Sequence, residues 1–472
     1  MSANREAADS RRADAFVLFG ASGDLASRKL LPALYRLAVR DRLGIPVVGV
    51  ASSEWNDEEL RRRARKAVEQ RGEAIDEDQF RRFAAALSYV SGDYRDPGLF
   101  DRLKERLESA RRPLFYLAIP PSLFETVVNS LSRVGLATDG RVIVEKPFGR
   151  DLPSAQELNR CLRQAFPEEA IFRIDHYLGK ETVENLLVFR FANSLLEPVW
   201  NRRYVRAVRV TMAEEIGVAG RGTFYDSVGA LRDVVQNHLL QVVTLLAMEP
   251  PVGVRPDDLR DEAVKVLRAT RDASPAEMVR GQYQGYRDEP GVAPDSRVET
   301  FVALRMWIDS WRWAGVPFVL RAGKRMAATA LEATVEFQKP PRLFFAEAGT
   351  PSPNPNVLRF RLGGEDEGIK LEVQAKQPGE GLRTQRIDLD MTYEEAFGTE
   401  GLDAYERLLA DAIEGHPGRF AREDAVEEAW RIVTPLLGDP SEPYPYAPGS
   451  WGPKEADRLV QEIGGWHNPS PA

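Results

Sequence analysis

The feature that most constrains the fold of this chain is a series of short apolar runs separated by segments with helical periodicity. The first run ends in a glycine and leads into a stretch whose leucines recur at helical spacing. Short apolar runs that alternate with helices are typical of strands buried in a parallel, doubly wound sheet. The four runs that predict this sheet are 15-AFVLFG-20, 45-IPVVGVAS-52, 113-PLFYLAIPP-121 and 141-RVIVEKPFG-149.

Beyond Asp175 the pattern changes to an alternation of apolar and polar residues, which is the period of a strand with one buried face. These segments follow one another closely and are accompanied by helices, so they predict an α+β domain with a large, mainly antiparallel sheet. We expect a disordered leader over residues 1–14, an α/β domain over 15–175 and the second domain over 176–472. The alternating segments are 205–215, 298–308, 318–324, 331–338, 357–364 and 369–376.

The composition excludes several classes of protein. The chain has 472 residues, more than one typical core, and its formal net charge of −8 argues against a general nucleic-acid binder. Its single cysteine, Cys161, rules out a disulfide framework or a cysteine-rich metal site within one chain and fits a reducing compartment. The first residues lack an apolar signal core, and no run of 18 apolar residues occurs, so we expect a cytoplasmic protein without a membrane span.

The first glycine turn predicts a phosphate-binding site. Gly20-x-x-Gly23-x-x-Ala26 follows the first strand and opens the first helix. Small residues there let the backbone approach a dinucleotide pyrophosphate, and the helix N-terminus supplies unpaired N–H groups. The alternative is a helix capped after a tight turn by Asp24 or Ser22.

A lysine and a proline follow the fourth apolar run, in 145-EKPFG-149. Parallel sheets bind their ligands at the carboxyl ends of the strands, so Lys146 would place a cation in the ligand crevice. Pro147 is a candidate for a cis peptide bond. A plain strand-to-loop turn with a solvated lysine is the alternative.

The stretch 172-FRIDHYLGK-180 concentrates polar groups after a short strand. His176, Tyr177 and Lys180 offer donors that suit a phosphate monoester. Asp175 cannot favour an anion, and a carboxylate there is better suited to orient a second group, as in an Asp–His pair. The alternative is a salt-bridged strand end with a partly buried histidine.

A second histidine lies on an amphipathic helix, in 232-RDVVQNHLLQ-241. Asp233 and His238 are five residues apart, about 1.4 turns of an α-helix, so both could meet one ligand in a cleft. A glycine-rich loop upstream would bring Glu214 to the same cleft. The alternative is a surface histidine beside a salt-bridged aspartate.

Together these motifs resemble the glucose-6-phosphate dehydrogenase family, in order and in spacing, from about residue 15 to 460. The resemblance implies a Rossmann-type coenzyme domain followed by an α+β domain whose large sheet packs in a homodimer or a dimer of dimers. It also implies oxidation of the C1 hydroxyl of glucose 6-phosphate to the 1,5-lactone, the first step of the oxidative pentose phosphate pathway. The motifs are GASGDLA, EKPFGRD, RIDHYLGKE, GRGTFYDSVGALRDVVQNHLLQ, GVPFVLRAGK and SWGPKEAD.

The resemblance also assigns roles to residues. His238 matches the general base and Asp175 the carboxylate that orients it, and no metal is needed because the coenzyme accepts the hydride. The phosphate pocket matches His176, Tyr177 and Lys180, and the residues that hold the sugar match Lys146, Glu214, Asp233 and Lys324. The expected coenzyme residues are Gly20, Ala21, Ser22, Gly23, Asp24, Leu25, Ala26, Ser27, Ser52, Tyr116 and Lys146, with Lys29 near the active site.

The chain departs from the family after the second apolar run. Ser52 stands where the family usually has an arginine that binds the 2′-phosphate of NADP, and Glu54 follows nearby. A carboxylate near the ribose favours a free 2′-hydroxyl, so we expect NAD to be used appreciably beside NADP. Arg28 or residues 61–63 could supply a substitute cation. Because Gly363 replaces the family's glutamine, and only Arg325 follows Lys324, we expect no second, structural NADP site.

Two alternatives stay open at this point. One is a hexose-6-phosphate dehydrogenase that prefers another sugar. The other is a non-catalytic sensor of nucleotide and sugar phosphate, which would be expected to have lost His238 or Asp175, and both are present.

Overall fold

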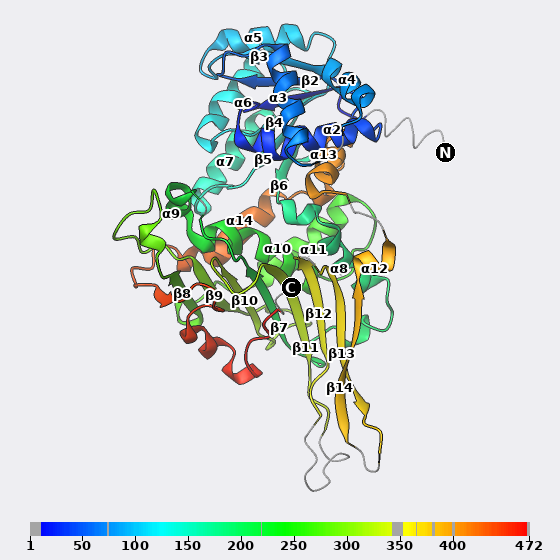
Figure 1. Cartoon of the computed structure of the whole chain (residues 1–472), viewed down its shortest axis with the longest axis vertical. Coiled ribbons are helices and arrows are strands. Elements are labelled where there is room, and N and C mark those ends of the chain that lie inside the picture. The colour runs from blue at the N-terminus through cyan, green and yellow to red at the C-terminus, as the bar shows by residue number, and fades with distance from the viewer. Residues whose placement is uncertain are drawn as a thin grey trace. The chain divides into compact units, whose positions relative to one another are not determined.

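The computed structural model describes residues 11–72, 75–218, 220–341, 353–364, 366–379, 383–398 and 402–469. The chain divides into two compact units (Figure 1). The first comprises Met1–Lys180, Val252–Arg260 and Leu402–Glu427, and the second comprises Glu181–Pro251, Asp261–Gly401 and Glu428–Ala472. Residues 1–10 of the expected leader lie outside the described residues. The backbone N–H of Ala13 already donates to Ile413 O at 2.7 Å, two residues before the first strand.

The first unit is built on a six-stranded sheet in the order β3-β2-β1-β4-β5-β6, with every neighbouring pair parallel. Four of the strands are the apolar runs described above, and β1, β2 and β4 are buried along their whole length, as strands covered on both faces are. The strands are β1 (Ala15–Phe19), β2 (Val47–Ala51), β3 (Leu87–Ser91), β4 (Pro113–Leu117), β5 (Arg141–Glu145) and β6 (Ile171–Ile174).

The helices of the first unit pack in two groups, α2, α3, α4 and α13 in one and α5, α6 and α7 in the other. Local caps define their starts: Asn56 accepts from Glu59 N–H at α3, and Asp151 and Ser154 form a capping box at α7. The helices are α2 (Leu31–Val39), α3 (Asp57–Glu69), α4 (Glu77–Ala86), α5 (Pro97–Arg106), α6 (Phe124–Arg133), α7 (Leu152–Ala165) and α13 (Ala404–Glu414), with the π-helix η1 (Ala26–Leu30) and the short η2 (Pro121–Leu123), η3 (Glu168–Ala170), η4 (His176–Gly179) and η10 (Pro417–Arg419).

The second unit is built on a nine-stranded sheet in the order β14-β13-β12-β11-β7-β10-β9-β8-β15. Its pairs are antiparallel except β7 with β10 and β8 with β15, so the expected mainly antiparallel sheet is confirmed. The strands are β7 (Val205–Ala213), β8 (Met278–Tyr283), β9 (Phe301–Met306), β10 (Phe318–Gly323), β11 (Ala330–Phe337), β12 (Val357–Gly363), β13 (Gly368–Lys376), β14 (Thr384–Thr392) and β15 (Tyr444–Tyr446).

The helices of the second unit include α8, which contacts β12, and η6, which contacts β10. Among the described residues, no helix is both long and apolar enough to cross a membrane. The helices are α8 (Glu181–Phe191), α9 (Gly222–Ala230), the π-helix η6 (Leu231–Leu239), α10 (Leu240–Ala247) and α12 (Tyr393–Phe397), with the short η5 (Glu197–Val199), η7 (Pro275–Glu277), η8 (Tyr286–Asp288), η11 (Thr434–Leu436), η12 (Lys454–Leu459) and η13 (Gln461–Ile463). Two further helices, α11 (Pro256–Ala269) and α14 (Glu423–Val433), each continue from a segment of the first unit into one of the second.

Candidate functional site

The turn after β1 lies at the position where the strand order of the first sheet reverses, between β1 and β4. Gly20 has a φ of +80°, and a Cβ there would lie 2.1 Å from the backbone oxygen of Ala118, the residue after β4, so both its conformation and this close approach require glycine. A Cβ on Gly23 would meet only Gly20 O, at 3.1 Å, and would otherwise fill open space before the helix. The open space and the exposed residues Ser22 to Asp24 fit a dinucleotide phosphate.

The helix that follows this turn is a π-helix over Ala26–Leu30, and its N-cap, Leu25, has no side-chain cap. Asp24, exposed to solvent, pairs instead with Arg28 at 2.7 Å. Asp24 itself lies in the first turn of the helix, so it is not the residue that precedes the helix.

Ser52 is exposed directly after β2. Of the arginines considered as substitute cations, Arg61 donates to the backbone oxygens of Ala84 and Leu87 at 2.8 and 3.0 Å. Arg63 bonds Glu59 at 2.8 Å, and its guanidinium lies 5.0 Å from the ring centre of Trp55.

The loop after β5 contains a cis peptide bond between Lys146 and Pro147, which confirms that expectation. Glu145, the last residue of β5, accepts a hydrogen bond from the hydroxyl of Tyr116 on β4. Tyr116 is wholly buried, and burial raises the pKa of its hydroxyl well above the usual range. Tyr116 therefore keeps its proton at neutral pH, and its expected place beside the coenzyme stays a prediction.

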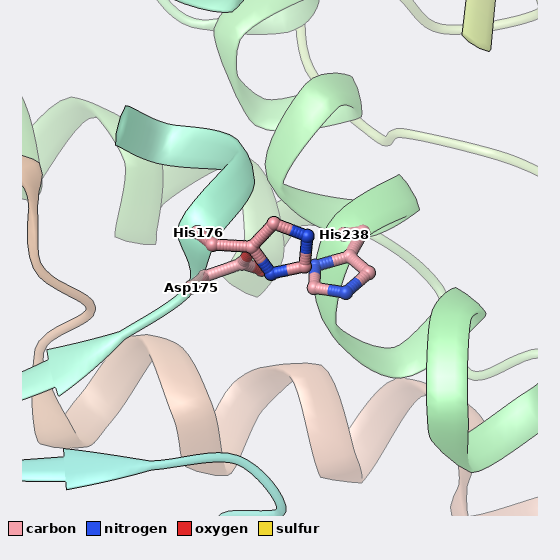
Figure 2. A group of neighbouring side chains, drawn as sticks. All are labelled: Asp175, His176 and His238. Carbon is pink, nitrogen blue, oxygen red and sulfur yellow. The ribbon is translucent and has the colours of Figure 1, made fainter. Parts of the chain in front are cut away.

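The stretch after β6 forms the short helix η4 (Figure 2). Asp175 is 2% exposed, and its carboxylate accepts from the backbone N–H of Tyr177 at 3.0 Å. The rings of His176 and Tyr177 lie 4.5 Å apart, and the ammonium of Lys180 lies 5.5 Å from the Tyr177 ring centre. The three expected phosphate-binding side chains thus come together at one end of the first unit's sheet.

Arg173, in the same stretch, binds side chains of the segment that precedes β6. It is fully buried and bonds the carboxylate of Glu168 at 2.7 Å and the amide oxygen of Asn159 at 2.9 Å. The guanidinium of Arg173 therefore forms its ion pair inside the first unit.

His238 lies on η6 and is only 2% exposed, so it is not the surface histidine of the alternative interpretation (Figure 2). The structure corrects the expected helix type, because residues 231–239 form a π-helix instead of an α-helix. Hydrogen bonds in a π-helix join residues five apart. Asp233 and His238, which have this spacing, therefore share a helix face more closely than 1.4 α-helical turns would allow.

Glu214 and Lys324 form an ion pair of 2.5 Å in the second unit. Each follows directly after one of the two parallel neighbours β7 and β10. The ammonium of Lys324 also lies 5.2 Å from the ring centre of Tyr225 on α9. Burial, followed by the nearby charge of Asp233, raises the pKa of Tyr225 well above its usual value.

Sequence reasoning missed three residues of these clusters. Glu145 stood in a quoted motif, but only its neighbour Lys146 was considered. Tyr225 lies in the quoted glycine-rich segment, where an aromatic residue is equally typical of a core. Tyr405, whose hydroxyl also bonds Glu145, lies far along the chain and had no local signal.

Two family models match nearly the whole chain. Residues 17–185 match "Glucose-6-phosphate dehydrogenase, NAD binding domain", and residues 187–467 match "Glucose-6-phosphate dehydrogenase, C-terminal domain". The first match agrees with the parallel sheet and the glycine turn described above, and it shows that the first unit is a nicotinamide dinucleotide-binding domain.

Curated relatives and solved structures agree with these matches. The chain is 46% identical to glucose-6-phosphate 1-dehydrogenase 1 of Mycobacterium bovis, over 97% of this chain and 96% of the relative. It is 41% identical to glucose-6-phosphate 1-dehydrogenase of Aggregatibacter actinomycetemcomitans, over 96% and 97% of the two chains.

Two solved structures have the same fold across nearly their full length. Glucose-6-phosphate 1-dehydrogenase from Mycobacterium avium superimposes with a TM-score of 0.90 at 46% identity, covering 98% of this chain and 99% of the other. A glucose-6-phosphate dehydrogenase in complex with its substrate glucose-6-phosphate gives a TM-score of 0.89 at 36% identity, covering 97% and 99%. The chain therefore belongs to the glucose-6-phosphate dehydrogenase family.

Proposed function

We propose that this chain oxidises the C1 hydroxyl of glucose 6-phosphate to the 1,5-lactone, with a nicotinamide dinucleotide as hydride acceptor. The observation that carries this proposal is the match to both family domains along 17–467, together with buried Asp175 and His238 in the two most specific motifs. A sensor that had lost catalysis would have no need to keep both groups.

His238 is the proposed general base, and Asp175 is the proposed carboxylate that orients it and stabilises its charged form. Imidazole suits this role because it ordinarily titrates near neutral pH. The base takes the O1–H proton while the C1–H bond breaks, and C1–O1 becomes the carbonyl of the lactone. The bound coenzyme supplies the acceptor for the hydride that leaves C1 with its electron pair.

The substrate is held at two ends in this proposal. His176, Tyr177 and Lys180 bind the 6-phosphate, a role supported by their shared position around one short helix. Lys146, Glu214, Asp233 and Lys324 hold the sugar hydroxyls. The pairing of Lys324 with Glu214 supports this, because a lysine held by a carboxylate offers its other N–H groups in defined directions.

The coenzyme residues proposed are those of the glycine turn, Gly20 to Ser27, together with Ser52, Tyr116 and Lys146. We further propose that NADP preference is weakened and that NAD is used appreciably. Ser52 brings no charge, and Glu54 nearby disfavours a 2′-phosphate. A lost charge-assisted contact costs about 1.5–3 kcal/mol, or about one to two orders of magnitude in affinity.

Assembly and location are proposed from the family alone. We expect a homodimer or a dimer of dimers in the cytoplasm, with the small-molecule substrate and no nucleic-acid or membrane partner. Sedimentation at equilibrium would test the assembly, and a monomer at micromolar concentration would contradict it.

One assay tests the main proposal. Reduction of NAD and of NADP is followed with glucose 6-phosphate and, separately, with its C2 and C4 epimers. The expected result is turnover with glucose 6-phosphate in preference to either epimer. No coenzyme reduction would refute the activity, preference for an epimer would refute the sugar assignment, and an NADP preference of about a hundredfold or more in kcat/KM would refute the coenzyme assignment.

A further inference from the structure

A buried carboxylate beside the proposed substrate residues has no part in the reaction proposed above. Glu145 ends β5, directly before Lys146, and accepts hydrogen bonds from two tyrosine hydroxyls. Tyr116 comes from the neighbouring strand β4, and Tyr405 comes from the first turn of α13. Glu145 therefore joins two strand ends of the sheet to a helix that lies far along the sequence.

The same helix packs closely against the turn that carries the phosphate-binding side chains. A Cβ on Gly179 would lie 2.7 Å from Ala404 O, so the backbones of η4 and α13 approach as closely as glycine allows. Arg407 donates to Gly179 O at 2.9 Å. The ring of Tyr405 lies parallel to that of His176 and offset from it, with centres 6.3 Å apart and planes 9° from parallel.

Tyr405 thus links the phosphate-binding turn to the end of β5, because its ring lies beside His176 and its hydroxyl bonds Glu145. Burial raises the pKa of both Glu145 and Tyr405, while the two tyrosine hydrogen bonds and Lys146 act in the opposite direction on Glu145. A buried carboxylate that accepts from two directed donors is held in one orientation, and so are its donors.

We propose that Tyr405 and Glu145 are positioning residues for the 6-phosphate subsite. Their hydrogen bond fixes the ring of Tyr405, which in turn holds the imidazole of His176 at the angle needed to donate to the phosphate. Through Glu145 the same bond ties this ring to the strand end that carries Lys146. The inference rests on the proposed function, because it deepens the assignment of the phosphate site.

Tyr405→Phe is the central test, because it keeps the ring and removes only the hydroxyl. Its KM for glucose 6-phosphate is expected to rise about fivefold to tenfold, as is the inhibition constant of inorganic phosphate competing with that substrate. The KM for the coenzyme should stay within about twofold. Glu145→Gln keeps one acceptor oxygen where the carboxylate has two, so it should raise the same two constants in the same direction but by less than Tyr405→Phe.

Tyr35→Phe is the matched control. Tyr35 is also a buried tyrosine of the first unit, and its hydroxyl accepts from Asp76 N–H at 3.2 Å. Tyr35→Phe should lower the melting temperature without changing the KM for glucose 6-phosphate or the inhibition constant of phosphate. If Tyr405→Phe changes only the melting temperature, or raises the KM values of substrate and coenzyme equally, the positioning role is refuted.

The failures of the two proposals are distinguishable. If the wild-type enzyme does not oxidise glucose 6-phosphate, the proposed function is refuted. If the wild-type enzyme oxidises glucose 6-phosphate but Tyr405→Phe leaves the substrate KM and the phosphate inhibition constant unchanged, only the positioning role is refuted. Should Glu145→Gln fail to fold, Tyr405→Phe alone decides the question.

Discussion

The ammonium of Lys324 and the carboxylate of Glu214 lie 2.5 Å apart, each one residue beyond the end of a parallel strand. The side chain of Lys324 is 12% exposed, so the pair is largely shielded from solvent. A largely buried cation with a carboxylate on one side and the ring of Tyr225 on another has little freedom to move. This arrangement leads to the first prediction.

Lys324→Met should raise the KM for glucose 6-phosphate by about tenfold, because it removes the proposed charged donor to the sugar and leaves Glu214 without its cation. Steady-state kinetics measure this. Lys265→Met is the control, since Lys265 also pairs with a glutamate, at 2.7 Å, but is 67% exposed. Equal KM values in the two variants would contradict the assignment.

His238→Asn should lower kcat by about a thousandfold, within the range for general-base catalysis, because the amide cannot take the C1 hydroxyl proton. Binding of glucose 6-phosphate, measured by calorimetry without turnover, should change by less than about threefold. His416→Asn serves as the control, because His416 is 53% exposed and lies outside the proposed site. Normal turnover in His238→Asn would rule out its role as the base.

Ser52→Arg should raise the ratio of kcat/KM for NADP over NAD by about tenfold to a hundredfold, since it adds a charge-assisted contact at the proposed 2′-phosphate position. The same charge placed at Ser132, which is exposed on α6, is the control for a general electrostatic effect. A ratio that rises equally in both variants would show that the position of Ser52 is not what matters.

Gly20→Ala should destabilise the protein by about 3 kcal/mol or more, because it combines a positive φ with a Cβ 2.1 Å from Ala118 O. Gly135 has the same φ of +80°, but a Cβ there meets nothing within 4 Å. Gly135→Ala should therefore cost only about 1 kcal/mol. Urea unfolding of both variants measures the difference, and equal costs would mean that the close approach of β4 is unimportant.

Glu336 predicts a pH dependence of stability. Burial raises its pKa, but hydrogen bonds and charges from His467, Arg209 and Arg206 outweigh this and lower it from 4.5 to about 2. Because the folded protein favours the ionised form, this stabilisation is complete above about pH 4.5 and is lost as the pH falls through about 2. A shift of this size corresponds to about 3 kcal/mol.

The measurement is urea unfolding of Glu336→Gln and of the wild type as a function of pH. The variant should be less stable by about 3 kcal/mol at pH 7, and the difference should shrink between about pH 4.5 and 2. Glu462→Gln, at a glutamate with an 85% exposed side chain, should show no such convergence. A difference that is constant with pH would contradict the role of this charge.

Much of the fold could be predicted from local patterns, and the exceptions have physical reasons. The short apolar runs identified β1, β2, β4 and β5 because parallel strands are buried on both faces. The strand β3, Leu-Ser-Tyr-Val-Ser, was missed because it has no continuous apolar run. The type of η6 was wrong because the apolar pattern of its sequence does not separate a π-helix from an α-helix.

The proposed site residues were identified from local sequence and from the family resemblance, and their roles stay predictions. The pairings between them could not be predicted. Glu214 was expected to be placed by a glycine-rich loop, whereas it follows a strand and is held by Lys324. Nothing local indicates that β7 and β10, more than a hundred residues apart, are neighbours.

The sequence by itself therefore determined the classes of the two domains, the family and the chemistry available to it, because residue type and spacing are local properties. Only the tertiary structure decided which of these groups hold one another in place. Strand order brings Lys324 to Glu214, and the return of α13 to the first unit brings Tyr405 to Glu145 and His176. Such contacts depend on the burial of surfaces far apart in the chain, which no single segment specifies.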